Sequence, residues 1–104
     1  RIEKVYERFI EGNYNINCIT DDNKTLKGVI TLKDINKIRR EDWNQEVGDY
    51  VRKPYAVTHP GETLSDALYK MTTHNIESLP VVNNLNDNIV IGQVSRNEII
   101  SRMH

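Results

Sequence analysis

The 104-residue chain is 38% apolar and 28% charged with a formal net charge of −1, which fits one compact domain without room for a second independent core. Its acidic and basic residues are interspersed, so it lacks the basic stripe that would favour nucleic acid as a partner. Its one cysteine, Cys18, excludes an intramolecular disulfide, and neither Cys18 nor the three histidines have metal-ligand spacing, so we expect a reducing compartment and no metal site.

The first part of the chain predicts a helix, a hairpin and a second helix. Residues 2–10 carry apolar side chains at helical spacing, and Gly12-Asn13 supplies a stop. Residues 14–19 mostly alternate like a half-buried strand, and a second strand is expected over 26–30 after a turn-rich stretch. A helical stripe then restarts at Leu32.

The segment 37–54 is expected to be a connector that is held against a core. A wholly solvated linker would have no use for large apolar side chains. The connector contains four of them: Trp43, Val47, Tyr50 and Val51.

The second part of the chain repeats the same order of elements more completely. It predicts a strand over 55–58, a helix from Leu64 that Asn75 closes, strands over 78–82 and 89–94, and a terminal helix over 97–103. The order is therefore β, α, β, β, α, and the first part shows this order from its helix onward.

A repeated phrase links the two parts. GVITLKDI at 28–35 corresponds to GQVSRNEI at 92–99, so that the glycine, the hydroxyl and the acid each recur 64 residues later, as Gly92, Ser95 and Glu98. We therefore expect an α/β (α+β) fold of two pseudo-symmetric β-α-β-β-α units that pack through their small sheets. The first unit lacks its opening strand.

The hydroxyl and the acid of the phrase have two compatible interpretations. Thr31-x-x-Asp34 and Ser95-x-x-Glu98 both have the form of a helix capping box, which Thr63-x-x-Asp66 shares. A glycine three residues before the hydroxyl, as in the two repeated copies, lets another backbone or a planar group approach closely. The same corner also suits a sugar phosphate, with amides and hydroxyl on phosphate oxygens and the carboxylate on a ribose diol.

The second part of the chain, VGDYVRKPYAVTHPGETLSDALYKMTTHNIESLPVVNN with GQVSRNEII, resembles a complete CBS motif. RIEKVYERFIEGNYNINCITDDNKTLKGVITLKDI resembles a second motif without its first strand, so the chain resembles a CBS domain pair, or Bateman module, with motifs at 1–45 and 46–104. The resemblance implies a regulatory module that senses AMP, ADP, ATP or S-adenosylmethionine and needs no cofactor.

The resemblance also implies which residues would bind the nucleotide. Arg96 would be the phosphate cation, and the cleft of the second copy, from Val57 to Glu98, is expected to be the better site. The full set of implied nucleotide-binding residues is Thr31, Asp34, Val57, Thr58, Ile76, Ser78, Pro80, Ser95, Arg96 and Glu98.

The connector DINKIRREDWNQEVGDYV is similar to the linker in CBS pairs attached to site-2-protease-like (M50) membrane zinc metalloproteases. The chain begins at Arg1 without a methionine, which predicts an excised piece of a longer protein. The resemblance therefore implies an attached upstream domain, a membrane-embedded metalloprotease, with this module on its cytoplasmic side.

Two other hypotheses remain. A CBS pair without a ligand could serve as a dimerisation or docking scaffold, since capping explains the same residues. A homodimer is implied by the resemblance, through helical faces that carry Ile2, Val5 and Phe9 in one copy and Leu64, Leu68 and Met71 in the other.

An enzyme is not expected, because no nucleophile and orienting acid can be placed beside His59 or His74, and we predict no catalytic residue.

Overall fold

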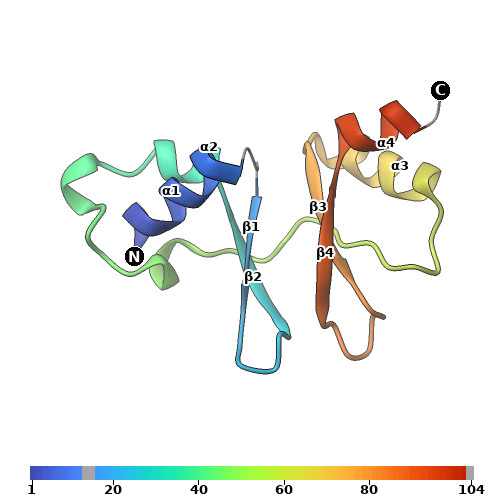
Figure 1. Ribbon diagram of the computed structural model, residues 1–104, viewed down its shortest axis with the longest axis horizontal. Helices are drawn as coiled ribbons and strands as arrows, with labels where there is room; N and C mark the ends of the chain where they lie inside the picture. The colour runs from blue at the N-terminus through green and yellow to red at the C-terminus, as the bar shows by residue number, and fades with distance from the viewer. Residues whose placement is uncertain (13–15, 103–104) are drawn as a thin grey trace.

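Two hairpins stand side by side in the structure, a computed structural model that describes residues 1–12 and 16–102, and each hairpin carries two helices (Figure 1). The expected helix stop at Asn13, the strand start at Tyr14 and the helix end at Met103 lie outside the described residues. The elements in chain order are α1 (Ile2–Gly12), β1 (Ile16–Thr20), β2 (Leu26–Thr31), α2 (Leu32–Asn36), the 3₁₀ turns η1 (Arg40–Asp42) and η2 (Val47–Tyr50), α3 (Leu64–His74), β3 (Ser78–Val82), β4 (Val90–Ser95) and α4 (Arg96–Arg102).

The two copies are related by an approximate twofold symmetry that follows the 64-residue repeat. Lys24 and Asn88, 64 residues apart, both have a left-handed backbone, with φ of 66° and 57°. They exchange equivalent hydrogen bonds, because Leu26 N–H donates to the Asn88 carbonyl and Val90 N–H donates to the Lys24 carbonyl, both at 2.9 Å. Each hairpin also has a register shift at the corresponding place. The predicted internal repeat is therefore confirmed in three dimensions.

The sheets pack against each other through a small apolar core. Ile16, Leu26 and Val29 of the first hairpin and Val82 of the second are buried there, with Val57 and Val90 at the margin. Cys18 lies at the edge of this cluster, and its burial raises the pKa of the thiol, which keeps it protonated and unreactive. The predicted packing through the sheets is confirmed.

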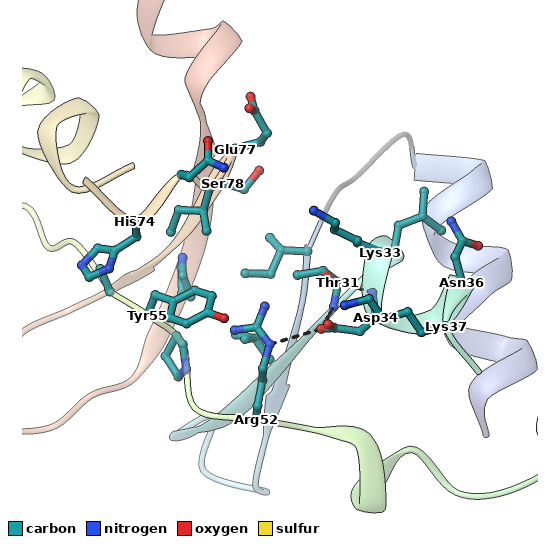
Figure 2. A pocket seen from close by; sticks show the side chains of 18 residues that line it. Thr31, Lys33, Asp34, Asn36, Lys37, Arg52, Tyr55, His74, Glu77 and Ser78 are labelled. Atoms are coloured by element: carbon teal, nitrogen blue, oxygen red, sulfur yellow. Dashed lines mark hydrogen bonds and ion pairs between the residues drawn. The ribbon is translucent and has the colours of Figure 1, made fainter. Parts of the chain in front are cut away.

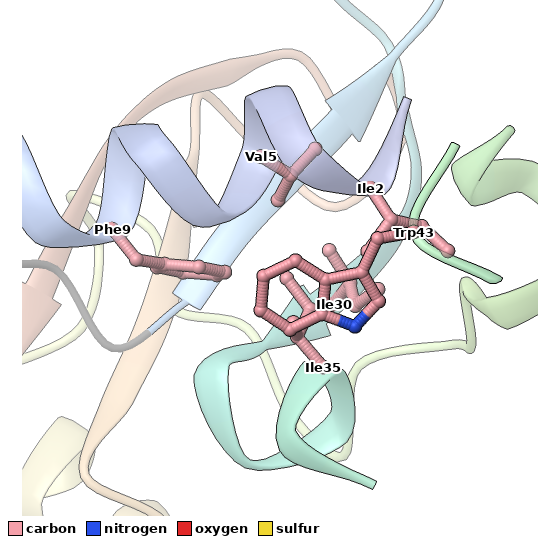
Figure 3. Packing of buried hydrophobic residues seen from close by; sticks show 6 residues of the cluster. All are labelled: Ile2, Val5, Phe9, Ile30, Ile35 and Trp43. Carbon is pink, nitrogen blue, oxygen red and sulfur yellow. The ribbon is translucent and has the colours of Figure 1, made fainter. Parts of the chain in front are cut away.

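The first copy has its own core, built around Trp43 from the connector (Figure 3). The indole is 9% exposed and lies 4.7 Å from the Tyr6 ring, while its Nε1–H donates to the Ile38 carbonyl at 3.1 Å. The other buried members of this cluster are Ile2, Val5, Phe9, Ile30 and Ile35. Val47 and Tyr50 pack against it, so the prediction that the connector is held to a core is confirmed.

The connector also completes the start of α1. The Ile2 and Glu3 N–H groups, which have no partner within the helix, donate to the carbonyls of Gln45 and Trp43 at 3.1 Å. One segment therefore closes the core and caps the helix backbone.

The strand predicted over 55–58 does not form, and only Thr58 pairs, through an isolated parallel bridge to Val81. The reason lies six residues earlier, where Arg52 N–H donates to the Val29 carbonyl and Val29 N–H donates to the Arg52 carbonyl, at 3.0 and 2.7 Å. The short segment between these two bridges crosses from the first sheet to the second and cannot run along either one. Its two ends thus form one bridge with each copy, at Arg52 and at Thr58. The first copy, which was expected to lack its opening strand, therefore has one bridge in its place.

The apolar stripes that we expected to form a dimer face are largely used inside the chain. Ile2, Val5 and Phe9 are buried in the first core, and Met71 is buried in a third cluster with Ala67, Leu79 and Ile99. Of the predicted stripe residues, Leu64 is exposed, at 43%, and Leu68 is partly buried against the third cluster. No helix within the described ranges is long and apolar enough to cross a membrane.

The two repeated glycines differ in their surroundings. A Cβ added to Gly28 would lie 2.3 Å from Val51 Cγ1 and 2.9 Å from the Arg52 carbonyl oxygen, whereas one added to Gly92 would meet nothing within 4 Å. Gly28 thus permits the close backbone approach that the sequence predicted, and Gly92 does not use it.

We therefore expect Gly28→Ala to destabilise the chain by about 1–3 kcal/mol, because the connector must move away from β2. The matched control Gly92→Ala should be neutral or stabilising by about 0.5 kcal/mol, since alanine has less chain entropy to lose in a strand. Urea unfolding of both variants measures the difference. Equal effects at the two positions would contradict the close approach.

Candidate functional site

A cavity of about 680 Å³ lies between the two copies, and both of them contribute its walls (Figure 2). One wall is the corner between β2 and α2, and the opposite wall is the segment that leaves α3 and enters β3. The connector passes below, between the two walls. This volume is within the roughly 300–1,000 Å³ of small-molecule sites.

The corner of the first copy is a complete capping box. Asp34 N–H donates to Thr31 Oγ1 at 3.1 Å, and Thr31 N–H donates to Asp34 Oδ2 at 3.0 Å. Both side chains keep unused hydrogen-bonding groups, because the Thr31 hydroxyl still has its own O–H to donate and Asp34 still has a second carboxylate oxygen to accept. The corner can therefore cap the helix and bind a polar ligand together.

The connector places a cation in the cavity, and the residue directly after it adds an aromatic ring. Arg52 Nε lies 3.4 Å from Asp34 Oδ2, and its guanidinium carbon lies 4.4 Å from the centre of the Tyr55 ring. Tyr55 in turn is stacked on His74, with ring centres 6.0 Å apart and planes at 9°. Asp34, Arg52, Tyr55 and His74 thus form a continuous row from the first copy to the second, which Figure 2 shows.

The opposite wall is set by the way α3 ends. Asn75 ends the helix as predicted. It takes a left-handed conformation, with φ of 54°, and the chain turns sharply so that Ile76 N–H donates to the Met71 carbonyl at 2.9 Å. Ile76 then faces the cavity, followed by Ser78 and Pro80. This wall offers an apolar surface suited to a planar base, with one hydroxyl beside it.

Five of the ten predicted site residues line this cavity and five do not. Those that line it are Thr31, Asp34, Ile76, Ser78 and Pro80. Those that do not are Val57, Thr58, Ser95, Arg96 and Glu98.

The residues outside the cavity have structural roles that explain their positions. Val57 packs into the core between the sheets, and Thr58 is 6% exposed at its bridge to Val81. Ser95 and Glu98 form the capping box of α4, with both hydrogen bonds at 3.2 Å. The Arg96 N–H donates to the Glu77 carbonyl at 2.8 Å, and the side chain does not reach the cavity.

The grouping of the site residues therefore differs from the predicted one. We expected the better of two clefts between the motifs to be lined by the second copy, from Val57 to Glu98, whereas this cavity has the second copy's Ile76 and Pro80 opposite the first copy's Asp34. The approximate twofold symmetry causes this, since it brings the corner of one copy to the strand entry of the other.

Among the lining residues outside the predicted set are three cations and an aromatic ring: Lys33, Lys37, Arg52 and Tyr55. Arg52, in the connector, and Tyr55, just after it, lie outside the repeated phrase, so the internal repeat does not mark them. Lys33 and Lys37 lie four residues apart around α2 and flank Asp34 in the sequence. This closeness to a predicted site residue was the feature that could have identified them.

Within residues 1–12 and 16–102, no group of three or more histidine, cysteine or acidic side chains could hold a metal ion. His59 Nδ1 accepts a hydrogen bond from Gly61 N–H at 3.1 Å, which closes the turn after Pro60. His74 stacks on Tyr55.

An ion pair holds the segment before α3 in place, which fixes the connector on its second side. Lys70 Nζ donates to Glu62 Oε1 at 2.6 Å and to the Val57 carbonyl at 2.8 Å. The pKa of Glu62 is lowered from its ordinary value of 4.5, mainly because of this hydrogen bond from Lys70. A carboxyl with a depressed pKa in the folded state stabilises the fold above its unfolded pKa, and the contribution is lost as the pH falls through the folded value.

We expect Glu62→Gln to lower the free energy of unfolding by roughly 0.5–1 kcal/mol at pH 7. The difference from the unmodified chain should begin to shrink as the pH falls below 4.5, the ordinary pKa of Glu62, and should be lost as the pH falls through the lower pKa of the folded state. Urea unfolding at a series of pH values measures both quantities. A difference that stays constant with pH would show that the carboxylate charge is not what matters.

Comparison with known proteins places this geometry in a family. The model of the CBS domain family matches residues 1–41 and 47–104. Inosine-5'-monophosphate dehydrogenase of Helicobacter pylori is 32% identical over 99 residues, which are 92% of this chain and 20% of the dehydrogenase. An uncharacterized protein of Methanocaldococcus jannaschii is 30% identical over 83 residues, 78% of this chain and 30% of that protein. The chain thus spans about a fifth to a third of the length of these relatives.

Solved structures agree with the fold. The CBS domain pair of protein MJ0100, in complex with 5'-methylthioadenosine and S-adenosyl-L-methionine, superimposes with a TM-score of 0.79 at 28% identity, covering 98% of this chain and 79% of that one. CBSX2 in complex with AMP has a TM-score of 0.78 at 23% identity, covering 98% of this chain and 80% of that one. At 23% identity, the similarity to CBSX2 shows the fold alone.

Proposed function

The chain belongs to the CBS domain family, and we propose that it is a regulatory module that senses an adenosine nucleotide in the cavity between its two copies. CBS domain pairs are regulatory and not catalytic, and the solved structures similar to this one include a CBS domain pair bound to S-adenosyl-L-methionine and 5'-methylthioadenosine, and CBSX2 bound to AMP. The observation that carries the proposal is the Thr31–Asp34 corner, which faces the apolar wall of the other copy across the cavity.

Each part of an adenosine nucleotide has a partner of suitable chemistry in the cavity. The adenine ring would lie against Ile76, where flat apolar contact favours an aromatic base, and Pro80, which is fully buried, would support this wall from behind. The ribose diol has two O–H donors and would be bound by the carboxylate of Asp34, which only accepts. The Thr31 O–H would donate to a phosphate oxygen.

The capping role of Asp34 does not oppose this assignment. Its Oδ2 is used by the Thr31 N–H and by Arg52, and a diol needs the other oxygen. In Asp34→Asn the single amide oxygen can still cap Thr31, but the amide N–H₂ then faces the diol, so that two donors meet.

We therefore expect Asp34→Asn to abolish AMP binding measured by calorimetry, with little change in the melting temperature. The matched control is Asp66→Asn, because Asp66 and Thr63 form the same capping box at the start of α3, with both hydrogen bonds at 3.0 Å, outside the cavity. That variant should bind AMP as the unmodified chain does.

Other outcomes point to a different function. Loss of stability in both variants, with no heat from AMP, ATP or S-adenosylmethionine at millimolar concentration in the unmodified chain, would favour the scaffold hypothesis. Under that hypothesis the boxes only cap helices.

The wider setting of the module remains a proposal. We propose that it controls an attached domain, and the similarity of 34–51 to linkers of site-2-protease-like metalloproteases supports a membrane-embedded peptidase and a cytoplasmic position. The dimer also stays a prediction, but its face cannot be the stripe of Ile2, Val5 and Phe9, which the first core buries. The sequence of the longer protein, with or without a zinc-binding H-E-x-x-H motif, tests the attachment.

A further inference from the structure

Arg52 is fixed in the cavity by both its backbone and its side chain. Its N–H and carbonyl exchange hydrogen bonds with Val29, at 3.0 and 2.7 Å, so the residue cannot slide along the sheet. Its guanidinium is held between the Asp34 carboxylate, at 3.4 Å, and the Tyr55 ring, at 4.4 Å. The side chain is 34% exposed, and Figure 2 shows it between the two walls.

Arg52 pairs with Oδ2 of Asp34, and a ligand diol takes the other carboxylate oxygen, so the guanidinium stays beside a ligand bound at this corner. A neutral ligand offers this half-buried cation no further partner. A phosphate on the same ligand does offer one, and the planar guanidinium fork matches phosphate oxygens with two hydrogen bonds. A phosphorylated ligand therefore gains a charge-assisted contact that an unphosphorylated one lacks.

The remaining charges of the cavity favour the same class of ligand. Lys33 and Lys37 also line it, and neither has an ion-pair partner among the described residues. Glu77 is the one carboxylate of the lining besides Asp34 within the described ranges, and it lies on the opposite wall (Figure 2). A cationic sulfonium ligand would meet three cations near the Asp34 corner, and an anion would be attracted to them.

We propose that Arg52 is a specificity-determining residue that makes the cavity prefer phosphorylated adenosine ligands to 5'-methylthioadenosine and S-adenosylmethionine. The inference rests on the proposed function and adds to it a ligand class and the residue that selects it. It also moves the phosphate contact from Arg96, which the repeated phrase suggested, to the connector.

The test is calorimetric titration of the 104-residue chain with AMP and with 5'-methylthioadenosine, in the unmodified chain and in Arg52→Met. The unmodified chain should bind AMP more tightly. Arg52→Met should weaken AMP about tenfold or more, while 5'-methylthioadenosine should bind equally well, because it has no phosphate for the guanidinium to contact. Arg52→Lys keeps the charge without the fork and should restore part of the preference for AMP.

Arg40→Met is the matched control, because the Arg40 guanidinium lies 4.5 Å over the Trp43 ring in the same kind of contact but outside the cavity. It should leave both affinities unchanged. Thermal melting of each variant separates loss of binding from loss of fold.

Three results would overturn the inference. One is an equal weakening of both ligands in Arg52→Met, and another is a loss of AMP binding in Arg96→Met instead. Tighter binding of 5'-methylthioadenosine than of AMP by the unmodified chain would also refute it, while leaving the adenosine-sensing function intact. Absence of any binding by the unmodified chain would reject the sensing function together with the inference.

Discussion

The exchange of backbone hydrogen bonds between the two hairpin tips determines where everything else lies. Leu26 donates to Asn88 and Val90 donates to Lys24, and behind these bonds Val29 and Val82 fill the space between the sheets. Strands of five or six residues lead from this junction to the helix corners, so the corner of one copy is fixed opposite the strand entry of the other. The cavity is a consequence of this junction.

The connector makes the two copies unequal. It buries Trp43 in the first core, passes against Gly28, and pairs through Arg52 with Val29 before it reaches Thr58 and the second sheet. The second copy has no comparable approach at Gly92. The connector thus adds one charged side chain, Arg52, to a cavity that is otherwise lined mainly by the two copies. This asymmetry is the physical basis for discrimination among ligands.

The sequence predicted the elements and the pairing well, since turn residues, capping boxes and the 64-residue shift are local signals. The end of α3 at Asn75 and the strand Ser78–Val82 are examples. The prediction was wrong where one segment pairs with both sheets, because the strand expected over 55–58 is reduced to the isolated bridge at Thr58. The residues that line the cavity could not be predicted fully from the sequence either, because a phrase repeated in each copy does not reveal that Asp34 faces Ile76.

A cavity shared by both copies is tested most directly by NMR, with the ¹⁵N-labelled chain titrated with AMP. We expect the amide signals of Thr31 and Asp34 in the first copy and of Ile76 and Ser78 in the second to shift together, with one common dissociation constant. Shifts confined to one copy, or centred on Ser95 and Glu98 with Thr31 and Asp34 unaffected, would contradict a shared site.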